Sequence, residues 1–309
     1  MKFKLRRVLI AVADGSARKV VDRAAQLVGK SKIHIELFSV VQPPPTVLGM
    51  TRVDDSEITR HMVEEKRRQL AKLAARLSDK GITTTCTVVA NASVIDAIVR
   101  QVKKSKADLV AIEAHKHTLL QRLFLSQYDY DLIRHCPAPL LIVKGGKIRR
   151  GAPILAALDP WHSIQKPQEL DGMIASAGRT LAETLGAKLH SVHVYSPLTG
   201  FALDGAFAPI AMPVSLPEEK DHLANLRRNF AKVNARFGIE KHRSHLRMGD
   251  PAFILPTLVK SLRAQILVMG AISRSAVGRL LIGSTAERVL DSLPCDVLIM
   301  RPLAIRSKK

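Results

Sequence analysis

The segment Ser261–Leu290 reads "SLRAQILVMGAISRSAVGRLLIGSTAERVL" and carries the clearest structural signal in the chain. Its short apolar run, Ile266–Met269, ends at a glycine, which is typical of a buried strand. A basic loop follows, and Gly283-Ser284-Thr285 then opens a helical pattern. Because the N–H groups and the dipole at the start of a helix favour an anion, a strand, loop and helix of this kind can hold a phosphate.

The chain contains two copies of one pattern. A shift of 157 residues places matching residues on one another: Gly29 on Gly186, Gly81 on Gly238, Ala107 on Ala264, and Pro137 on Pro294. The first strands match at a shift of 145, which places Asp14 on Asp159. Two copies of this length predict two similar domains rather than a solenoid of short repeats. We place the domains at residues 1–148 and 149–309.

Each copy alternates apolar runs with helical patterns. The predicted strands of the first copy are Val8–Ala13, Ile33–Val41, Ile82–Val89, Leu109–Ile112 and Leu140–Val143. Its predicted helices are Ala17–Val28, Glu57–Ser78, Val94–Lys103 and Gln127–His135. The predicted strands of the second copy are Ile154–Leu158, Leu189–Tyr195, Ile239–Leu246, Ile266–Met269 and Val297–Met300.

This alternation predicts the α/β class, with two tandem, Rossmann-like domains built on doubly wound parallel sheets. Five strands per domain most simply take the order 3-2-1-4-5. We expect an intrachain pseudo-dimer joined through Leu140–Val143 and Val297–Met300, because an open apolar edge strand invites pairing. The same order brings Asp159, at the end of the first strand, close to Gly270 at the end of the fourth.

Composition describes a globular protein of 309 residues, with 47% hydrophobic and 24% charged residues. No apolar run approaches the roughly 18–20 residues that a membrane span needs, so we expect no span. Three cysteines, few and far apart, fit a reducing compartment, and we expect a cytoplasmic protein. The net charge of +21 attracts anions of every kind. Because its basic residues are scattered over helix faces, a solvated surface is favoured over a nucleic-acid interface.

The candidate phosphate site belongs to the second copy. Its residues are Asp159, Gly270, Ser273, Arg274, Gly283, Ser284 and Thr285. Glycine permits close approach of a ligand, and the hydroxyls and the arginine can bind phosphate. The plainer alternative is a glycine at a strand end followed by an ordinary Ser/Thr helix cap.

Two stretches resemble the nucleotide-binding segment of the universal stress protein family: "VMGAISRSAVGRLLIGSTAERVL" (Val268–Leu290) and "PCDVLIMRP" (Pro294–Pro302). The family pattern is Gly, two residues, Gly, nine residues, Gly-Ser/Thr. "RMGDPAFIL" (Arg247–Leu255) is similar to the family's turn into its third helix. "EAHKHTLLQRLFLSQYDYDLIRHCPAPLLIVK" (Glu113–Lys144) resembles the first domain of tandem members.

The resemblance implies a stress-response protein that binds ATP or a related nucleotide in its second domain, with Asp159 near the adenine or ribose. It leaves a homodimer open. Two departures weaken the match: Ser273 stands where the family has its second glycine, and Pro160-Trp161 follows Asp159 in place of Gly-Ser.

The first copy lacks the phosphate-binding residues. Glu113, Lys116, Ser126 and Gln127 stand where the second copy has Gly270, Ser273, Gly283 and Ser284. A glutamate adds bulk and like charge, so we expect no ATP in this domain. His115 and His117 point the same way on an extended chain and can hold zinc with Asp129, Asp131 or water. Ordinary surface histidines are the other interpretation.

The chain shows no catalytic triad spacing and no P-loop lysine, so we expect a binding protein with slow hydrolysis of ATP at most. The apolar loop Ser196–Glu219 either extends the nucleotide crevice or covers the core or the other domain. The alternative function is a carrier or sensor of an apolar, phosphate-bearing metabolite, with this loop over its tail. A basic, nucleic-acid-associated protein ranks third.

Overall fold

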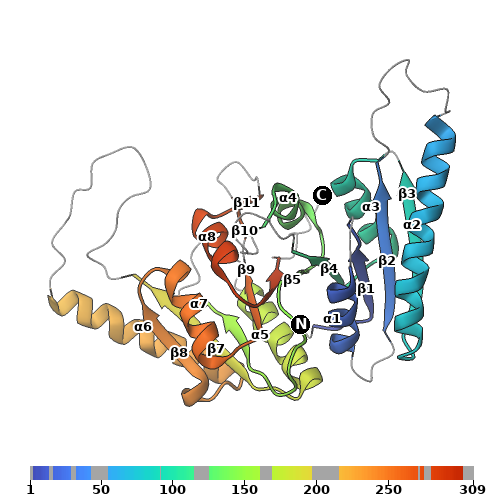
Figure 1. Ribbon diagram of the computed structural model, residues 1–309. Coiled ribbons are helices and arrows are strands. Elements are labelled where there is room, and N and C mark those ends of the chain that lie inside the picture. Colours follow the sequence, from blue (N-terminus) through green and yellow to red (C-terminus); the bar gives the residue numbers. More distant parts are fainter. Residues whose placement is uncertain are drawn as a thin grey trace, which may run out of the picture. The chain divides into compact units, whose positions relative to one another are not determined.

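The structure, a computed structural model, describes residues 3–13, 17–28, 33–42, 55–90, 92–114, 125–160, 169–196, 216–270, 272–274 and 280–301. These residues form two compact units (Figure 1). The first unit comprises Lys4–Arg150 together with Asp296–Arg301, and the second comprises Gly151–Cys295 with Phe3. Each unit has its own run of neighbouring strands, which is described below as the sheet of that unit.

The sheet of the first unit has the order β3-β2-β1-β4-β5-β12. Its strands are β1 (Arg7–Ala11), β2 (His34–Val41), β3 (Thr83–Ala90), β4 (Leu109–Glu113), β5 (Leu140–Val143) and β12 (Asp296–Met300). The first five strands are parallel and confirm the predicted order 3-2-1-4-5. β1, β4 and β5 are apolar and almost wholly buried, as strands covered on both faces must be.

Four helices cover this sheet: α1 (Arg18–Val28), α2 (Asp55–Ser78), α3 (Val94–Ser105) and α4 (Gln127–His135). α1 contacts α2, and α3 contacts α4. Right-handed crossovers put the first pair on one face and the second pair on the other, because the chain reverses its direction across the sheet after β3.

The last strand of the second repeat pairs with a strand of the first unit. β12 runs antiparallel to β5, with Leu298 opposite Leu141. The buried carboxylate of Asp296 accepts the backbone N–H groups of Lys144 and Gly145, both at 2.9 Å, and forms an ion pair with buried Arg23 at 2.9 Å. The predicted pairing of the two last strands is therefore confirmed.

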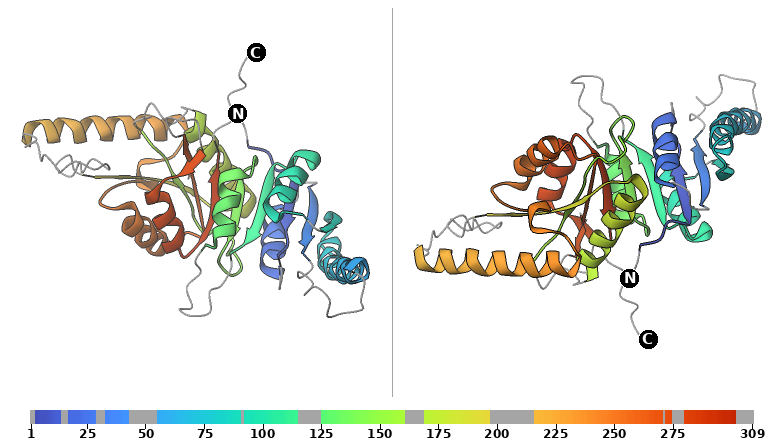
Figure 2. Two further views of the ribbon diagram at one scale, coloured as in Figure 1. Left: turned by 90° about the horizontal axis from the view of Figure 1, so that it is seen from above. Right: turned by 90° about the horizontal axis from the view of Figure 1, so that it is seen from below.

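The sheet of the second unit has the order β9-β6-β7-β8, all parallel. Its strands are β6 (Ile154–Ala157), β7 (Leu189–Tyr195), β8 (Ser244–Met248) and β9 (Ile266–Gly270). Its helices are α5 (Glu169–Leu185), α6 (Leu216–Arg236), α7 (Pro251–Leu262) and α8 (Ser284–Ser292). The order repeats that of the first repeat, except that the fifth strand, β12, belongs to the other unit. Figure 2 shows α2 and α6, which hold equivalent places in the two repeats, as long helices.

Most of the observed bounds lie within two residues of the predicted ones. Two local details differ more. β8 begins at Ser244 rather than Ile239, because a 3-10 turn over Lys241–Arg243 precedes it. Between β9 and α8, the strands β10 (Ile272–Arg274) and β11 (Leu280–Ile282) pair antiparallel as a hairpin. The sequence predicts only a loop here, because a strand of three residues is too short to show an alternation of apolar and polar side chains. Among the described residues, no helix is long and apolar enough to cross a membrane.

Candidate functional site

A cavity of about 400 Å³ lies in the second unit, at the carboxyl ends of its central strands. It brings together four of the predicted site residues: Asp159, Gly270, Gly283 and Thr285. Side chains from α5, α7 and β7 complete its wall, and most of them are apolar. The volume lies within the range of small-molecule sites. Its position next to β6 and β9 is the topological switch point at which doubly wound sheets bind ligands.

The other three predicted residues lie nearby in the sequence, and of these Ser284 is not among the residues that line the cavity. Ser284 is the first residue of α8 and is exposed. Ser273 and Arg274 belong to β10, where Ser273 pairs with Leu281. Their side chains lie outside the described part of the structure. The extended backbone of a strand is one that serine adopts without strain, so Ser273 needs no glycine conformation there.

The two glycines have different roles. A Cβ atom on Gly270 would come within 2.9 Å of Leu170 Cδ2, so a side chain there would require Leu170 on α5 to shift. Gly283 is the N-cap of α8 and contributes no side-chain hydrogen bond to the helix. A Cβ atom there would meet nothing within 4 Å. Within the described residues nothing covers the start of α8, and it offers backbone N–H groups and the positive end of the helix dipole to an anion.

Two cavity residues that sequence reasoning missed hold the loop after β6. The N–H of Asp159 donates to both carboxylate oxygens of Asp171, at 3.2 and 3.3 Å. His193 Nδ1 lies 3.0 Å from the carbonyl oxygen of Leu158. An acidic residue close to the start of a helix is a sequence signal for Asp171. His193 lies inside a strand, and no local signal separates it from its neighbours.

The turn into α7 forms another wall of the cavity through Pro251 and Leu255. Gly249 has φ of +137°, a conformation that favours glycine. Asp250 caps α7 by accepting the N–H of Ala252 at 2.9 Å. This backbone hydrogen bond, aided by Arg288 on α8, lowers the pKa of Asp250. The Asp250–Arg288 ion pair ties α7 to α8.

The equivalent helix start in the first repeat is closed by the chain itself. Ser126 caps α4 and accepts the N–H of Asp129, whose carboxylate in turn accepts the N–H of Ser126 at 2.8 Å. Asp129 is fully buried, and the second repeat has Ala286 at this position. Glu113, which replaces Gly270, forms an ion pair with Lys19 at 3.2 Å. A carboxylate therefore already occupies the place where an external anion would bind.

The predicted zinc ligands His115 and His117 lie outside the described residues. Of the carboxylates suggested to assist them, Asp129 is committed to the helix cap. Asp131 accepts hydrogen bonds from Gln127 and Arg134. No group of three or more metal-binding side chains occurs within the described ranges. The zinc site stays a prediction.

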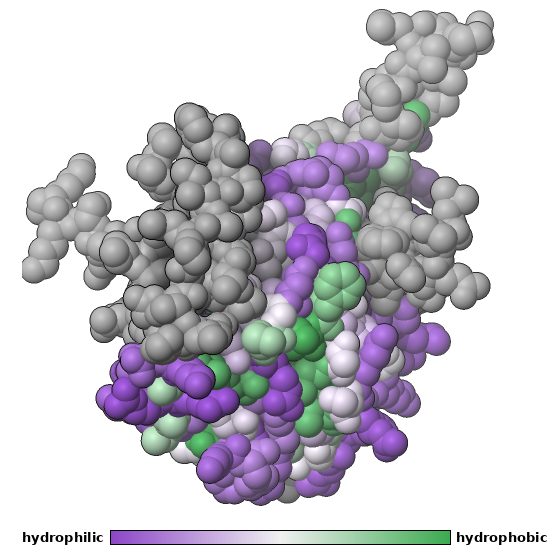
Figure 3. Space-filling view, turned by 90° about the vertical axis from the view of Figure 1, so that its left-hand side faces the viewer, coloured by the Kyte–Doolittle hydropathy of each residue, from purple (hydrophilic) through white to green (hydrophobic). Residues whose placement is uncertain are grey.

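Figure 3 views the side of the second unit that carries α6 and α7. Hydrophilic side chains cover much of this face, and a narrow apolar strip runs between them. Two large hydrophobic residues of this unit are exposed: Met248, at the end of β8, is 59% exposed, and Phe253, on the first turn of α7, is 71% exposed.

Comparison with known proteins agrees with this architecture. The Universal stress protein family matches residues 4–144 and 153–301. Universal stress protein E homolog of Haemophilus influenzae is 26% identical over 320 residues, with 98% of each chain covered. Universal stress protein E of Escherichia coli K12 is 25% identical, over 92% of this chain and 89% of the relative.

Solved structures share the fold over the whole length. A functionally unknown protein of Pseudomonas aeruginosa PAO1 superposes with a TM-score of 0.75 at 22% identity, over 97% of this chain and 93% of that one. A universal stress protein of Archaeoglobus fulgidus gives a TM-score of 0.66 at 17% identity, over 95% and 97%. The chain belongs to the universal stress protein family, as a tandem member with two family domains.

Proposed function

We propose that the second domain binds ATP or a related nucleotide, and that the first domain does not bind it in the same manner. The observation that carries the proposal is the open start of α8 beside a cavity at the carboxyl ends of β6 and β9. Helix starts of this kind are general anion sites.

Each part of a nucleotide has a candidate partner. The phosphates would contact the backbone at Gly283 and the hydroxyls of Ser284 and Thr285, with Arg274 adding positive charge. The apolar wall, which includes Val192 and Leu255, suits the flat base. Asp159 would accept hydrogen bonds from the ribose, and Asp171 supports this role by fixing the Asp159 backbone.

We propose binding rather than fast catalysis. The chain has no P-loop lysine, and hydrolysis would be slow and regulatory. The three cysteines are free thiols, two of them buried, which supports the expectation of a reducing cytoplasm.

The repeats offer a matched test. Calorimetric titration of the full chain with ATP should give one site per chain. Asp159→Ala should weaken binding at least roughly tenfold, the cost of about one charge-assisted hydrogen bond. The equivalent change in the first repeat, Asp14→Ala, should leave the affinity unchanged. Two equal ATP sites, or equal losses from the two variants, would contradict the proposal.

The apolar wall also favours the second candidate, a carrier or sensor of an apolar metabolite that bears a phosphate. The anion would occupy the same helix start, and its apolar part would contact residues such as Ile174 and Met269. Native mass spectrometry of gently purified protein distinguishes the two candidates. A bound nucleotide favours the first, and a larger, lipid-like mass favours the second.

A further inference from the structure

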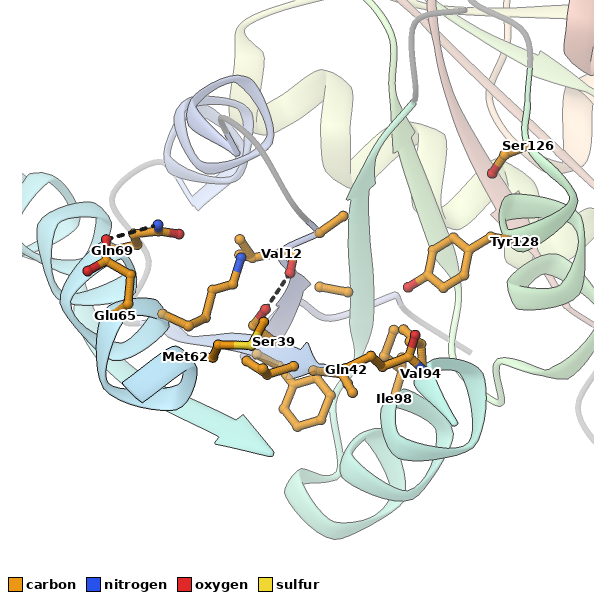
Figure 4. A pocket seen from close by; sticks show the side chains of 16 residues that line it. Val12, Ser39, Gln42, Met62, Glu65, Gln69, Val94, Ile98, Ser126 and Tyr128 are labelled. Carbon is orange, nitrogen blue, oxygen red and sulfur yellow. Dashed lines mark hydrogen bonds between the residues drawn. The ribbon is translucent and has the colours of Figure 1, made fainter. Parts of the chain in front are cut away.

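A cluster of basic side chains lies at the amino end of the sheet of the first unit, where β1 begins and α3 ends. The cluster consists of Arg6, Arg7, Lys103, Lys104 and Lys106, and all five side chains are exposed. We call it the basic patch. The same unit contains a cavity of about 690 Å³, but this cavity lies at the opposite, carboxyl ends of β1 and β2 (Figure 4). The basic patch is therefore a separate surface.

The fold brings the two halves of the basic patch together. The Arg7 guanidinium donates to the carbonyl oxygen of Ser105, 98 positions away in the chain, at 3.1 Å. One carboxylate oxygen of Asp108 accepts the backbone N–H groups of Arg6 and Arg7, both at 3.0 Å. In the sequence these bases are two separate pairs, which are typical of a scattered, solvated charge. The tertiary structure concentrates them on one surface.

The basic patch has little acidic compensation. Residues 4–8 and 97–112 contain one acidic residue, Asp108, and its carboxylate already accepts two backbone N–H groups. Among the described residues, the side chains of Arg6 and of the three lysines form no hydrogen bond or ion pair. Since like charges at close range repel, binding of an external anion would be favourable here.

The end of α3 does not need all of these charges for its own stability. Cations interact favourably with the carboxyl end of a helix, and Arg7 already serves this purpose at Ser105. Lys106 caps the helix with φ of 52° and ψ of 46°, a left-handed conformation that glycine adopts with less strain. A lysine at this position therefore adds charge at the expense of the best helix cap.

The second repeat lacks most of the basic patch. Gly151 and Ala152 stand at the places of the two arginines, and Lys260, Ser261 and Arg263 stand at those of the three lysines. Both repeats form the same strand and helix at this place, so the fold does not require the additional bases.

The chemistry of the basic patch fits the phosphates of a nucleic-acid duplex, which exposed lysines and arginines bind without reading the bases. An anionic membrane fits less well, because surfaces that bind membranes add apolar side chains. Among the described residues, the exposed large hydrophobic side chains are Met248 and Phe253, which belong to the other unit. Residues 4–8 and 97–108 contain no aromatic side chain on which the bases of a single strand could stack.

We propose that the basic patch binds the phosphate backbone of duplex nucleic acid, independently of base sequence. This inference does not rest on nucleotide binding in the second domain, because the patch belongs to the first unit and shares no residue with the candidate site.

The salt dependence of binding measures the number of phosphates contacted. Fluorescence anisotropy would follow the full chain binding to a labelled duplex of about 20 base pairs, roughly two helical turns. The logarithm of the association constant should fall linearly with the logarithm of the salt concentration, with a slope of about −4, since each phosphate contact contributes roughly −0.9. A duplex of unrelated sequence should bind equally well.

Substitutions locate the surface. Lys103→Ala with Lys104→Ala should make the slope less steep by about 2 and weaken binding at least roughly tenfold in about 0.1 M salt. Arg227→Ala with Arg228→Ala, an exposed pair on α6, removes the same charge from the other unit and should leave the slope unchanged. Lys106→Gly should weaken binding without lowering the free energy of unfolding in urea, because glycine suits the left-handed cap. This variant separates a loss of binding from a loss of folding.

Four outcomes would each overturn the proposal. They are absence of duplex binding at low salt, an unchanged slope in the double lysine variant, an equal loss in the α6 control, and stronger binding to vesicles of equimolar phosphatidylserine and phosphatidylcholine than to the duplex.

Discussion

Replacing Gly283 with aspartate should change nucleotide affinity and folding stability in opposite directions. Gly283 has φ of −69° and ψ of 145°, which every residue adopts, and a Cβ atom there meets nothing within 4 Å. The new side chain therefore fits without strain. Since aspartate is a better N-cap than glycine by a few tenths of a kcal/mol, the free energy of unfolding should rise slightly.

The same carboxylate would lie where we place the phosphates. Two unit charges near a protein surface repel by about 4 kcal/mol at 4 Å and by about half as much at 8 Å. Because 1.4 kcal/mol is a factor of ten, the affinity for ATP should fall at least roughly tenfold. Added salt should reduce the loss, since the helix start is exposed to solvent.

Two measurements on one protein sample separate these effects. Urea denaturation reports the free energy of unfolding, and calorimetry with ATP reports the affinity. The matched variant in the first repeat, Ser126→Asp, should leave ATP affinity unchanged, because the Asp129 carboxylate already occupies that helix start. Unchanged ATP affinity in Gly283→Asp, or an equal loss in both variants, would refute the asymmetry between the repeats.

Two further predictions concern buried charged groups and buried histidines, and a third concerns the zinc site expected from the sequence. Asp296→Asn should lower the free energy of unfolding in urea by about 3 kcal/mol, because it leaves the buried Arg23 charge without its partner; a loss below about 1 kcal/mol would contradict this. Burial, and then the neighbouring His245, lower the pKa of His190 to about 4, below its unfolded value of about 6.5. Between these two pKa values the folded protein binds fewer protons than the unfolded chain, so the free energy of unfolding should fall as the pH drops from about 6.5 to about 4. In His190→Gln the midpoint of urea denaturation should depend less steeply on pH over this range. If the first domain holds the predicted zinc site, elemental analysis should find about one zinc ion per chain. The double substitution His115→Ala, His117→Ala should remove this zinc. Protein that takes up no zinc at micromolar concentration would rule the site out.

The order of the elements was predictable because it depends on local pattern. α4 and β5 have the predicted bounds, since capping, helical periodicity and a short apolar run are all encoded within a few residues. Once two copies of alternating strands and helices were recognised, the rules of parallel sheets determined which loops meet. The juxtaposition of Asp159 with Gly270 and Gly283 followed from that topology.

Details that join distant segments were not predictable in this way. Asp171 and His193 reach the loop after β6 from other elements, and no local pattern marks such contacts. The Arg23–Asp296 ion pair joins residues from the two repeats, and its partners are typical surface residues by composition. Burial of a charge is a property of packing, so it cannot be found from the type of residue alone.

The sequence by itself determined the fold class and the duplication, because these depend on periodicity, and it pointed to the candidate anion site through glycine at particular positions. Only the tertiary structure decided whether each helix start is open. Asp129 closes α4 by turning its carboxylate back onto Ser126, whereas α8 has alanine at that position. The tertiary structure also decided that the first repeat keeps a cavity beside its closed helix start, because the space left between packed helices depends on side chains far apart in the chain.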